Sequence, residues 1–176
     1  MIVYVMRHGQ TNYNVMGLCN DDPSRDVYLT DTGVRQAQRA ALELRDVHLD
    51  RIVVSQLPRT RQTAELINRF HNVRIDASVE LNDIRSGFDG RPVSEYFAAI
   101  AHDRLHAAIN DGESLLAHKQ RVRTFIEALR SRPEAAVLVV AHEETLRVFL
   151  AYFHGLSDEQ MLALTIANCE TFRFDL

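Results

Sequence analysis

Short apolar segments alternate with longer amphipathic segments along this chain. Residues 2–6, 52–55 and 135–141 form nearly continuous apolar runs, and each run predicts a buried strand. The shorter segments 73–75 and 171–174 predict two further strands. Parallel strands that are buried on both faces show this kind of apolar run, because helices then cover the sheet on both sides.

The segments between the strands predict helices. Thr30 can cap a helix that buries an apolar stripe from Val34 to Leu44 at helical spacing. Pro58 suits the first turn of a helix that runs to about residue 70. Further helices are predicted over residues 93–109, 115–129 and 146–153. Strands that alternate with helices predict a three-layer α/β/α sandwich with a mostly parallel central sheet.

Polar residues follow the carboxyl ends of three predicted strands. Arg7 and His8 follow the first strand, Ser55 ends the second with Arg59 close behind, and His142 follows the strand over 135–141. Ligands of such sheets bind beyond the carboxyl ends of the strands, so we expect these side chains to lie near one another. The polar stretch 19–26, which contains Pro23, is expected to be a surface loop.

These strand-end groups suit a phosphoryl group, which carries about two negative charges at neutral pH. Arg7 and Arg59 supply forked cationic donors, and His142 adds an N–H at the expected N-terminus of a helix. His8 is the candidate nucleophile, because one neutral imidazole nitrogen is available near pH 7 while the other fixes the tautomer. The reaction then needs an acid for the leaving oxygen and a base for water.

Composition narrows the class of protein. The 176 residues, 46% of them hydrophobic, suffice for one ordinary domain with a substantial core. With 24 acidic and 20 basic residues the formal net charge is −4, which makes sequence-independent binding to a nucleic-acid backbone a poor expectation. Of the basic residues only Lys119 is a lysine, and outside the anion site we interpret the arginine excess as a compositional bias of the genome.

The sequence also bears on location. No apolar run approaches the roughly 18 residues that a membrane-spanning helix needs, and the apolar run 1–6 is too short for a secretory signal. Cys19 and Cys169 provide neither a disulfide framework nor a metal-binding spacing. We therefore expect a cytoplasmic protein with reduced thiols and without nucleic-acid or membrane partners. Its oligomeric state is not determined, because apolar helix faces can serve either a core or an interface.

Five ordered motifs resemble those of the histidine phosphatase, or phosphoglycerate mutase-like, superfamily over essentially the whole chain. They are Arg7-His8-Gly9-Gln10-Thr11, then Leu29-Thr30 with Gly33, Gln36 and Ala37, then Ser55-x-Leu57-x-Arg59-Thr60-x-Gln62-Thr63-Ala64, then Gly112-Glu113-Ser114, and finally Val139-Val140-Ala141-His142 with Arg147 after it. An Arg-His-Gly tripeptide alone is a weak signal, whereas five motifs in this order are a specific one.

The resemblance implies a phosphohistidine mechanism without a metal or an organic cofactor. His8 would take the phosphoryl group from a small phosphorylated substrate or a phosphoprotein, while Arg7, Arg59 and His142 hold the phosphoryl oxygens. Water would then hydrolyse the phosphohistidine. The protein would be a cofactor-independent phosphomonoester hydrolase.

The general acid has two candidates. Many members of the family carry Glu in a Leu-x-Glu-Ile segment, and Asp83 falls on that position in Leu81-Asn82-Asp83-Ile84. Glu80 lies three residues earlier. We expect Asp83 to be the acid and Glu80 to be a solvated carboxylate.

Other departures from the family pattern concern the pocket. Glu143 and Glu144 follow His142, where small residues are common. Glu143 could repel phosphate, or it could point away so that only its backbone N–H faces the pocket; acidic residues are also ordinary in the first turn of a helix. The short region between Glu95 and Asp111 leaves little material for a cap like that of the classical mutases.

We therefore expect residues 1–176 to form a single histidine phosphatase domain with a short cap region around residues 85–111. An open site favours a phosphatase over a mutase, because water can reach the phosphohistidine. Candidate substrate contacts beside the catalytic groups are Gly9, Thr11, Asn14, Arg85 and Glu143. Arg85 and Arg91 could select a second anionic group, and Cys19 and Asn20 also flank the catalytic segments.

Two other functions stay open from the residues alone. One is a phosphotransferase or mutase acting on a small metabolite, and the other is a catalytically weak phospho-ligand-binding protein, which Glu143 and Asp83 would suit. His102 and His106 have the spacing of a zincin pair, but the acid between them is Asp and no third ligand follows, so no metal site is expected. The remaining histidines outside the motifs are expected at or near the surface: His48, His71, His118 and His154.

Overall fold

One five-stranded sheet forms the centre of the molecule. The structure is a computed structural model that describes all residues, 1–176. Its strands are β1 (Ile2–Arg7), β2 (Arg51–Val54), β3 (Arg74–Ala77), β4 (Ala136–Ala141) and β5 (Thr171–Asp175). The strand order is β3-β2-β4-β1-β5, and β5 alone runs antiparallel to its neighbour.

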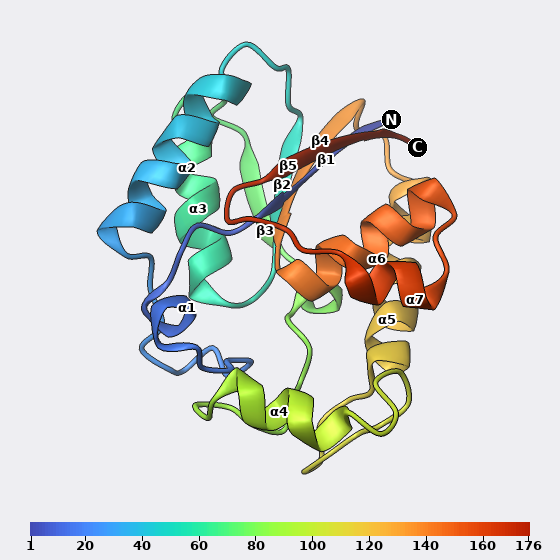
Figure 1. Cartoon of the computed structure of the whole chain (residues 1–176). Coiled ribbons are helices and arrows are strands. Elements are labelled where there is room, and N and C mark those ends of the chain that lie inside the picture. Colours follow the sequence, from blue (N-terminus) through green and yellow to red (C-terminus); the bar gives the residue numbers. More distant parts are fainter.

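Helices cover both faces of this sheet, which confirms the predicted α/β/α sandwich. The helices are α1 (Asn12–Met16), α2 (Asp31–Leu44), α3 (Pro58–Asn68), α4 (Val93–Ile100), α5 (Leu115–Leu129), α6 (Glu143–His154) and α7 (Asp158–Ala163), with a short 3₁₀ turn, η1, over Val79–Leu81. In Figure 1, α2 and α3 lie on one side of the sheet and α5, α6 and α7 on the other, while α4 stands apart beyond one end of the strands. No helix combines the length and the apolar character needed to cross a bilayer.

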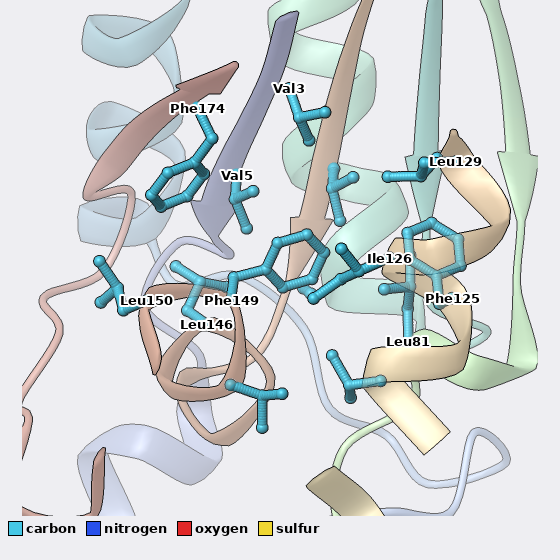
Figure 2. Close-up of a cluster of buried hydrophobic side chains, with 14 of the residues drawn as sticks. Val3, Val5, Leu81, Phe125, Ile126, Leu129, Leu146, Phe149, Leu150 and Phe174 are labelled. Carbon is cyan, nitrogen blue, oxygen red and sulfur yellow. The ribbon is translucent and has the colours of Figure 1, made fainter. Parts of the chain in front are cut away.

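The alternation of side chains along the strands divides the core between the two faces. In β1, Val3 and Val5 point into the larger cluster, which the sheet forms with α5 and α6 (Figure 2). The next side chain, Met6, points into a second cluster against α2 and α3. Strands whose side chains are buried on both faces explain the nearly continuous apolar runs in the sequence.

The helix signals in the sequence are present as local contacts. The Thr30 hydroxyl accepts the Gly33 N–H at the start of α2, and Pro58 occupies the first turn of α3. Val34 is only half-buried, and Ala40 completes the buried stripe of α2 instead.

The N-terminus of α2 presses directly on the loop that follows β1. A Cβ on Gly33 would lie 2.0 Å from the Gln10 carbonyl oxygen, and a Cβ on Gly9 would lie 2.6 Å from that of Gly33. Side chains at these two positions would push the loop away from α2. The glycines therefore fix where His8, the residue before Gly9, can stand.

The prediction of one helix over residues 93–109 is wrong for the second half of that range. α4 ends at Ile100, and turns follow in which Asn110 and Asp111 adopt positive φ. The Asp103 carboxylate accepts the backbone N–H of His106, and such a local bond competes with helix formation. The segment therefore folds back on itself before α5 begins.

A third, smaller core lies under α4, away from the sheet. It consists of six buried residues: Cys19, Ile84, Phe88, Tyr96, Ile100 and Leu115. They come from four separate segments of the chain, including α4 and the start of α5. This cluster packs α4 against the start of α5 and against the segments that carry Cys19 and Ile84.

Replacing Phe149 by Ala is expected to lower the free energy of unfolding by about 3–5 kcal/mol, measured by equilibrium urea unfolding. Phe149 is fully buried in the larger cluster, where it packs on Phe125 (Figure 2), so its removal leaves a cavity. Phe70→Ala is the matched control, because Phe70 is 51% exposed. Phe70→Ala should lower the free energy of unfolding by less than about 1 kcal/mol. An equal decrease in both variants would contradict the assignment of Phe149 to the core.

Candidate active site

The residues predicted at the strand ends meet beyond the carboxyl edge of the sheet. Arg7 of β1 pairs in register with Ala141 of β4, so His8 and His142 follow at adjacent positions. Their ring centroids lie 5.2 Å apart. Arg59, in the first turn of α3, donates its Nε–H to His8 Nε2 at 3.1 Å.

The hydrogen bonds of His8 define its tautomer. His8 Nδ1 lies 2.7 Å from the Gly9 carbonyl oxygen, which can only accept, so Nδ1 carries the proton. The lone pair is then on Nε2, the atom that accepts from Arg59. Burial and the neighbouring Arg59 charge hold the pKa of His8 well below its usual value. The ring is therefore neutral at pH 7, with Nε2 available as a nucleophile.

Arg59 joins three parts of the chain. Its Nη1 donates to the Asn20 side-chain oxygen at 2.6 Å, and its Nη2 donates to the Asn20 backbone oxygen and to Asp83 Oδ2, both at 3.1 Å. Asn20 and Cys19 are buried, so the expectation of a surface loop over 19–26 is wrong at its beginning. The buried guanidinium needs these acceptors, and they draw the loop inward.

His142 caps α6 and is fully buried. Its Nε2 lies 2.8 Å from the Ser55 hydroxyl, while its Nδ1 has no hydrogen-bond partner and lies 3.6 Å from Asp83 Oδ2. The Ser55 hydroxyl also lies 2.9 Å from the Thr60 hydroxyl, and when Thr60 donates to Ser55, the Ser55 proton points to His142 Nε2. This geometry favours the tautomer with a proton on Nδ1, which faces the carboxylate. Burial and the charge of Arg59 lower the pKa of His142.

Glu143 pairs directly with the strand-end arginine. Its Oε2 lies 2.9 Å from Arg7 Nη1, and its Oε1 accepts from Arg147 Nη2 and from the backbone N–H of Ile166, both at 3.2 Å. The side chain therefore points at Arg7 rather than away from the pocket. Arg7 Nη1 also donates to the Ile166 carbonyl, and Arg7 Nε is buried without a partner.

A cavity of about 220 Å³ opens over these groups. Seven of the expected catalytic and substrate-contact residues line it: Arg7, His8, Thr11, Asn14, Arg59, Asp83 and Glu143. Cys19 and Asn20, also named from the sequence, line it as well. His142 does not line the cavity, but its Nδ1 lies 3.6 Å from Oδ2 of Asp83, which does. Thr11 caps α1 and Asn14 completes its capping box, so both are held in place by local hydrogen bonds.

Two expected substrate contacts do not line the cavity. Ile84 and Ser86 face inward along an extended segment, so Arg85 between them points outward and is exposed. Gly9 lies beneath the cavity, where its N–H donates to the Thr63 hydroxyl and its carbonyl orients His8. Gly9 therefore positions the loop, and Arg85 has no contact with the site.

The two candidate acids separate clearly. Asp83 lines the cavity beside Arg59, whereas Glu80 lies outside it. The Glu80 carboxylate accepts from the Ser78 hydroxyl at 2.5 Å, and its backbone carbonyl accepts from Arg121 at 2.7 Å. Of the two, only Asp83 can contact a bound substrate.

The remaining histidines differ partly from expectation. His48 and His154 are exposed and His71 is half-buried, but His118 is completely buried, with its Nδ1 2.9 Å from Arg121 Nη2 and 3.6 Å from Glu113 Oε1. His118 sits on the inner face of α5, where the sequence pattern shows an apolar stripe interrupted by this residue. His102 and His106 are exposed, and no three His, Cys, Asp or Glu side chains gather closely enough to share a metal ion.

A neutral histidine nitrogen beside two arginines, at the carboxyl edge of a mostly parallel sheet, defines a class of α/β enzymes that act on anionic groups. The sequence profile of the histidine phosphatase superfamily (branch 1) matches residues 3–176. The chain therefore belongs to the histidine phosphatase superfamily, which confirms the resemblance, and it is a phosphoric monoester hydrolase.

Similar proteins support this membership. The adenosylcobalamin/alpha-ribazole phosphatase of Escherichia coli is 30% identical over 170 residues, which cover 92% of this chain and 83% of the relative. The 2,3-bisphosphoglycerate-dependent phosphoglycerate mutase of Thermoplasma acidophilum is 26% identical over 99% of this chain and 87% of its own. The crystal structure of the alpha-ribazole phosphatase from Shigella flexneri superposes with a TM-score of 0.90 at 28% identity, covering 100% of this chain and 91% of that one.

The low pKa values of His8 and His142 predict that both rings stay neutral when exposed histidines titrate. Nitrogen NMR of the rings should show that His8 and His142 remain neutral below about pH 6.5, where an unperturbed histidine would gain a proton. The unfolded chain then binds more protons than the folded chain, so these two groups make the free energy of unfolding fall as the pH drops below about 6.5. Protonation of either ring near pH 6.5 would refute this assignment.

Proposed function

We propose that this enzyme hydrolyses small phosphomonoesters through a phosphohistidine formed on His8. The observation that carries the proposal is the tautomer of His8, whose Nδ1–H is held by the Gly9 carbonyl while the unprotonated Nε2 lies 3.1 Å from Arg59 Nε. A nucleophile must offer a lone pair toward an electrophile that cations hold in place. The other ionisable side chains that line the cavity are arginines, acids, two tyrosines and Cys19, so His8 supplies the one imidazole nitrogen there.

In the first step, His8 Nε2 attacks the phosphorus atom and the bond from phosphorus to the leaving oxygen breaks. Arg7 and Arg59 hold the phosphoryl oxygens and offset the charge that develops on them. Arg7 Nε is buried without a protein partner, so a phosphoryl oxygen would satisfy it. Asn20 holds Arg59 in the orientation that this requires.

Asp83 has two roles in the proposal. Its carboxylate lies between Arg59 Nη2 at 3.1 Å and His142 Nδ1 at 3.6 Å, in a position that suits an anion. A phosphoryl oxygen would make the same two contacts and displace the carboxyl group toward the leaving oxygen. Away from Arg59 the carboxyl group takes up a proton from solvent and donates it to the leaving oxygen. The carboxylate that results accepts a proton from the water that attacks the phosphohistidine, and this restores the acid.

The second step releases inorganic phosphate and regenerates neutral His8. The bond between His8 Nε2 and phosphorus breaks as the oxygen of water bonds to phosphorus. Several relatives have names that specify alpha-ribazole phosphatase or phosphoglycerate mutase, so small phosphorylated metabolites form the first panel of substrates to assay. Expected finer properties are a cytoplasmic location and no nucleic-acid or membrane partner; the oligomeric state is left open.

A pulse of phosphorus-labelled substrate should leave acid-labile label on the enzyme, and His8→Ala should abolish both the label and the turnover. His102→Ala is the matched control, since His102 is exposed and outside the cavity, and it should keep both. Label that persists in His8→Ala would refute the proposal. Label that passes to an added acceptor alcohol in preference to water would identify a phosphotransferase, and vanadate binding without turnover would identify a binding protein.

Asp83→Asn should reduce the hydrolysis of phenyl phosphate, a substrate with a poor leaving group, by about a hundredfold or more, because the amide cannot donate the proton. It should reduce hydrolysis of 4-nitrophenyl phosphate much less. Inorganic phosphate should inhibit the variant more strongly, because a neutral side chain then occupies the anion position beside Arg59. Glu80→Gln is the matched control and should leave all three quantities unchanged; a loss in this variant like that in Asp83→Asn would contradict the choice of acid.

A further inference from the structure

The cavity has two chemically different sides. Arg7, His8 and Arg59 form the side next to the sheet. The opposite side is apolar and consists of Leu18, Val27, Ile84, Val93, Tyr96 and Phe97. These six residues, the apolar wall, come from the loop between α1 and α2, from the segment after η1, and from α4. A phosphoryl group held at His8 would direct the rest of its substrate toward this wall.

The apolar wall is built before any substrate arrives. Backbone hydrogen bonds tie the loop beside α1 to the start of α4: Val93 N–H to the Gly17 carbonyl at 2.8 Å, Cys19 N–H to the Arg91 carbonyl at 2.9 Å, and Gly90 N–H to the Cys19 carbonyl at 2.8 Å. Ile84 and Tyr96 also belong to the small core beneath α4. A wall supported from behind in this way presents a fixed surface, as preformed ligand sites do.

The third arginine in the cavity, Arg147, is already paired with two carboxylates. Arg147 donates Nη1 to Glu144 at 2.6 Å, Nη2 to Glu143 at 3.2 Å and Nε to the Leu164 carbonyl at 2.8 Å. Two carboxylates therefore neutralise it. Arg7 and Arg59 remain, and the phosphoryl group uses both.

Arginines around the rim are also engaged elsewhere. Arg91 pairs with Glu95 and lies over the ring of Phe88 at 4.7 Å, and Arg25 pairs with Asp89 at 2.5 Å. Neither lines the cavity. The sequence hypothesis that Arg91 or Arg85 selects a second anion therefore has no support in the geometry.

One exposed cation stands nearby without entering the cavity. Arg104 lies over the ring of Phe97 at 5.7 Å, on the rim rather than in the wall. Inside, the wall offers a single polar group, the Tyr96 hydroxyl. Burial and the charges of Glu144 and Asp83 raise the pKa of Tyr96, so this hydroxyl stays neutral. The other polar lining residues carry no positive charge: Thr11, Tyr13, Asn14, Asn20 and Ser86. A carboxylate on the leaving group would thus meet apolar atoms, groups without positive charge and the acids Glu144 and Asp83.

We propose that the enzyme selects phosphomonoesters whose leaving group is apolar and uncharged, and that it discriminates against leaving groups that carry a carboxylate or a second phosphate. This inference rests on the proposed reaction at His8 and adds to it the chemical class of the substrate. Its physical basis is that burying a charge without a partner is strongly unfavourable, whereas apolar contact is favourable. The apolar wall makes favourable contacts with an aromatic or branched group and offers no cation to an anion.

The test compares phenyl phosphate with 3-carboxyphenyl phosphate, using the intact enzyme. A carboxylate in the meta position changes the basicity of the leaving oxygen little, so the pair differs mainly in the charge that meets the wall. The value of kcat/KM for phenyl phosphate should exceed that for the carboxylated ester by about tenfold or more. Equal values, or a preference for the carboxylated ester, would overturn the proposal.

Phe97→Ala tests the wall itself. Phe97 is 36% exposed and lies on α4 away from the reacting atoms, so its removal should not prevent folding. The variant should lose about three- to tenfold in kcat/KM for phenyl phosphate and nothing for methyl phosphate, which is too small to reach the wall. Phe70→Ala, an exposed position outside the cavity, should change neither substrate. Equal losses on both esters in Phe97→Ala would contradict the proposed contact.

Failure of this inference is distinguishable from failure of the proposed reaction. If no ester labels His8, the reaction is wrong. If His8 is labelled and the carboxylated ester is the better substrate, only the assigned selectivity is wrong.

Discussion

The buried guanidinium of Arg59 is the interaction on which the rest of the site depends. It contacts His8 from the loop after β1, Asn20 from the loop after α1, and Asp83 from the segment after η1. A buried charge is tolerated only when its hydrogen bonds are satisfied, so each partner is held in place by the cost of leaving Arg59 without it. One side chain thereby links the sheet edge to the segments beneath α4, and its charge adds to the burial that lowers the pKa of His8.

Acidic side chains balance this positive charge in the ligand-free enzyme. Asp83 lies against Arg59, and Glu143 lies against Arg7, so each arginine that would hold phosphate already has a carboxylate partner. The two acids differ in their anchoring. Glu143 accepts hydrogen bonds from Arg147 and from the Ile166 N–H. Apart from its contact with Arg59, Asp83 accepts a hydrogen bond only from the N–H of the adjacent Ile84. Asp83 is therefore held by fewer contacts than Glu143, which agrees with the proposed displacement of its carboxyl group by a phosphoryl oxygen.

Much of the fold and of the candidate site could be predicted from the sequence, wherever the signal is local or periodic. Apolar runs gave the strands, caps at Thr30 and Pro58 gave helix starts, and the position of polar residues after strands led to His8, Arg59 and His142. Prediction failed where a contact distant in sequence decides. Cys19 and Asn20 are buried because Arg59 and the small core under α4 recruit them, and His118 is buried beside Glu113 and Arg121.

The sequence by itself determined the class of fold, the family and the residues that meet at the strand ends, because alternating apolar runs and short motifs are read within one segment at a time. Only the tertiary structure decided which acid faces the cavity, that Arg85 points outward, and that Arg147 is already neutralised by Glu143 and Glu144. These three features depend on the direction of side chains and on contacts between segments that are distant in the sequence. The packing of the cap region against the sheet edge sets both, and no spacing along the chain encodes them separately.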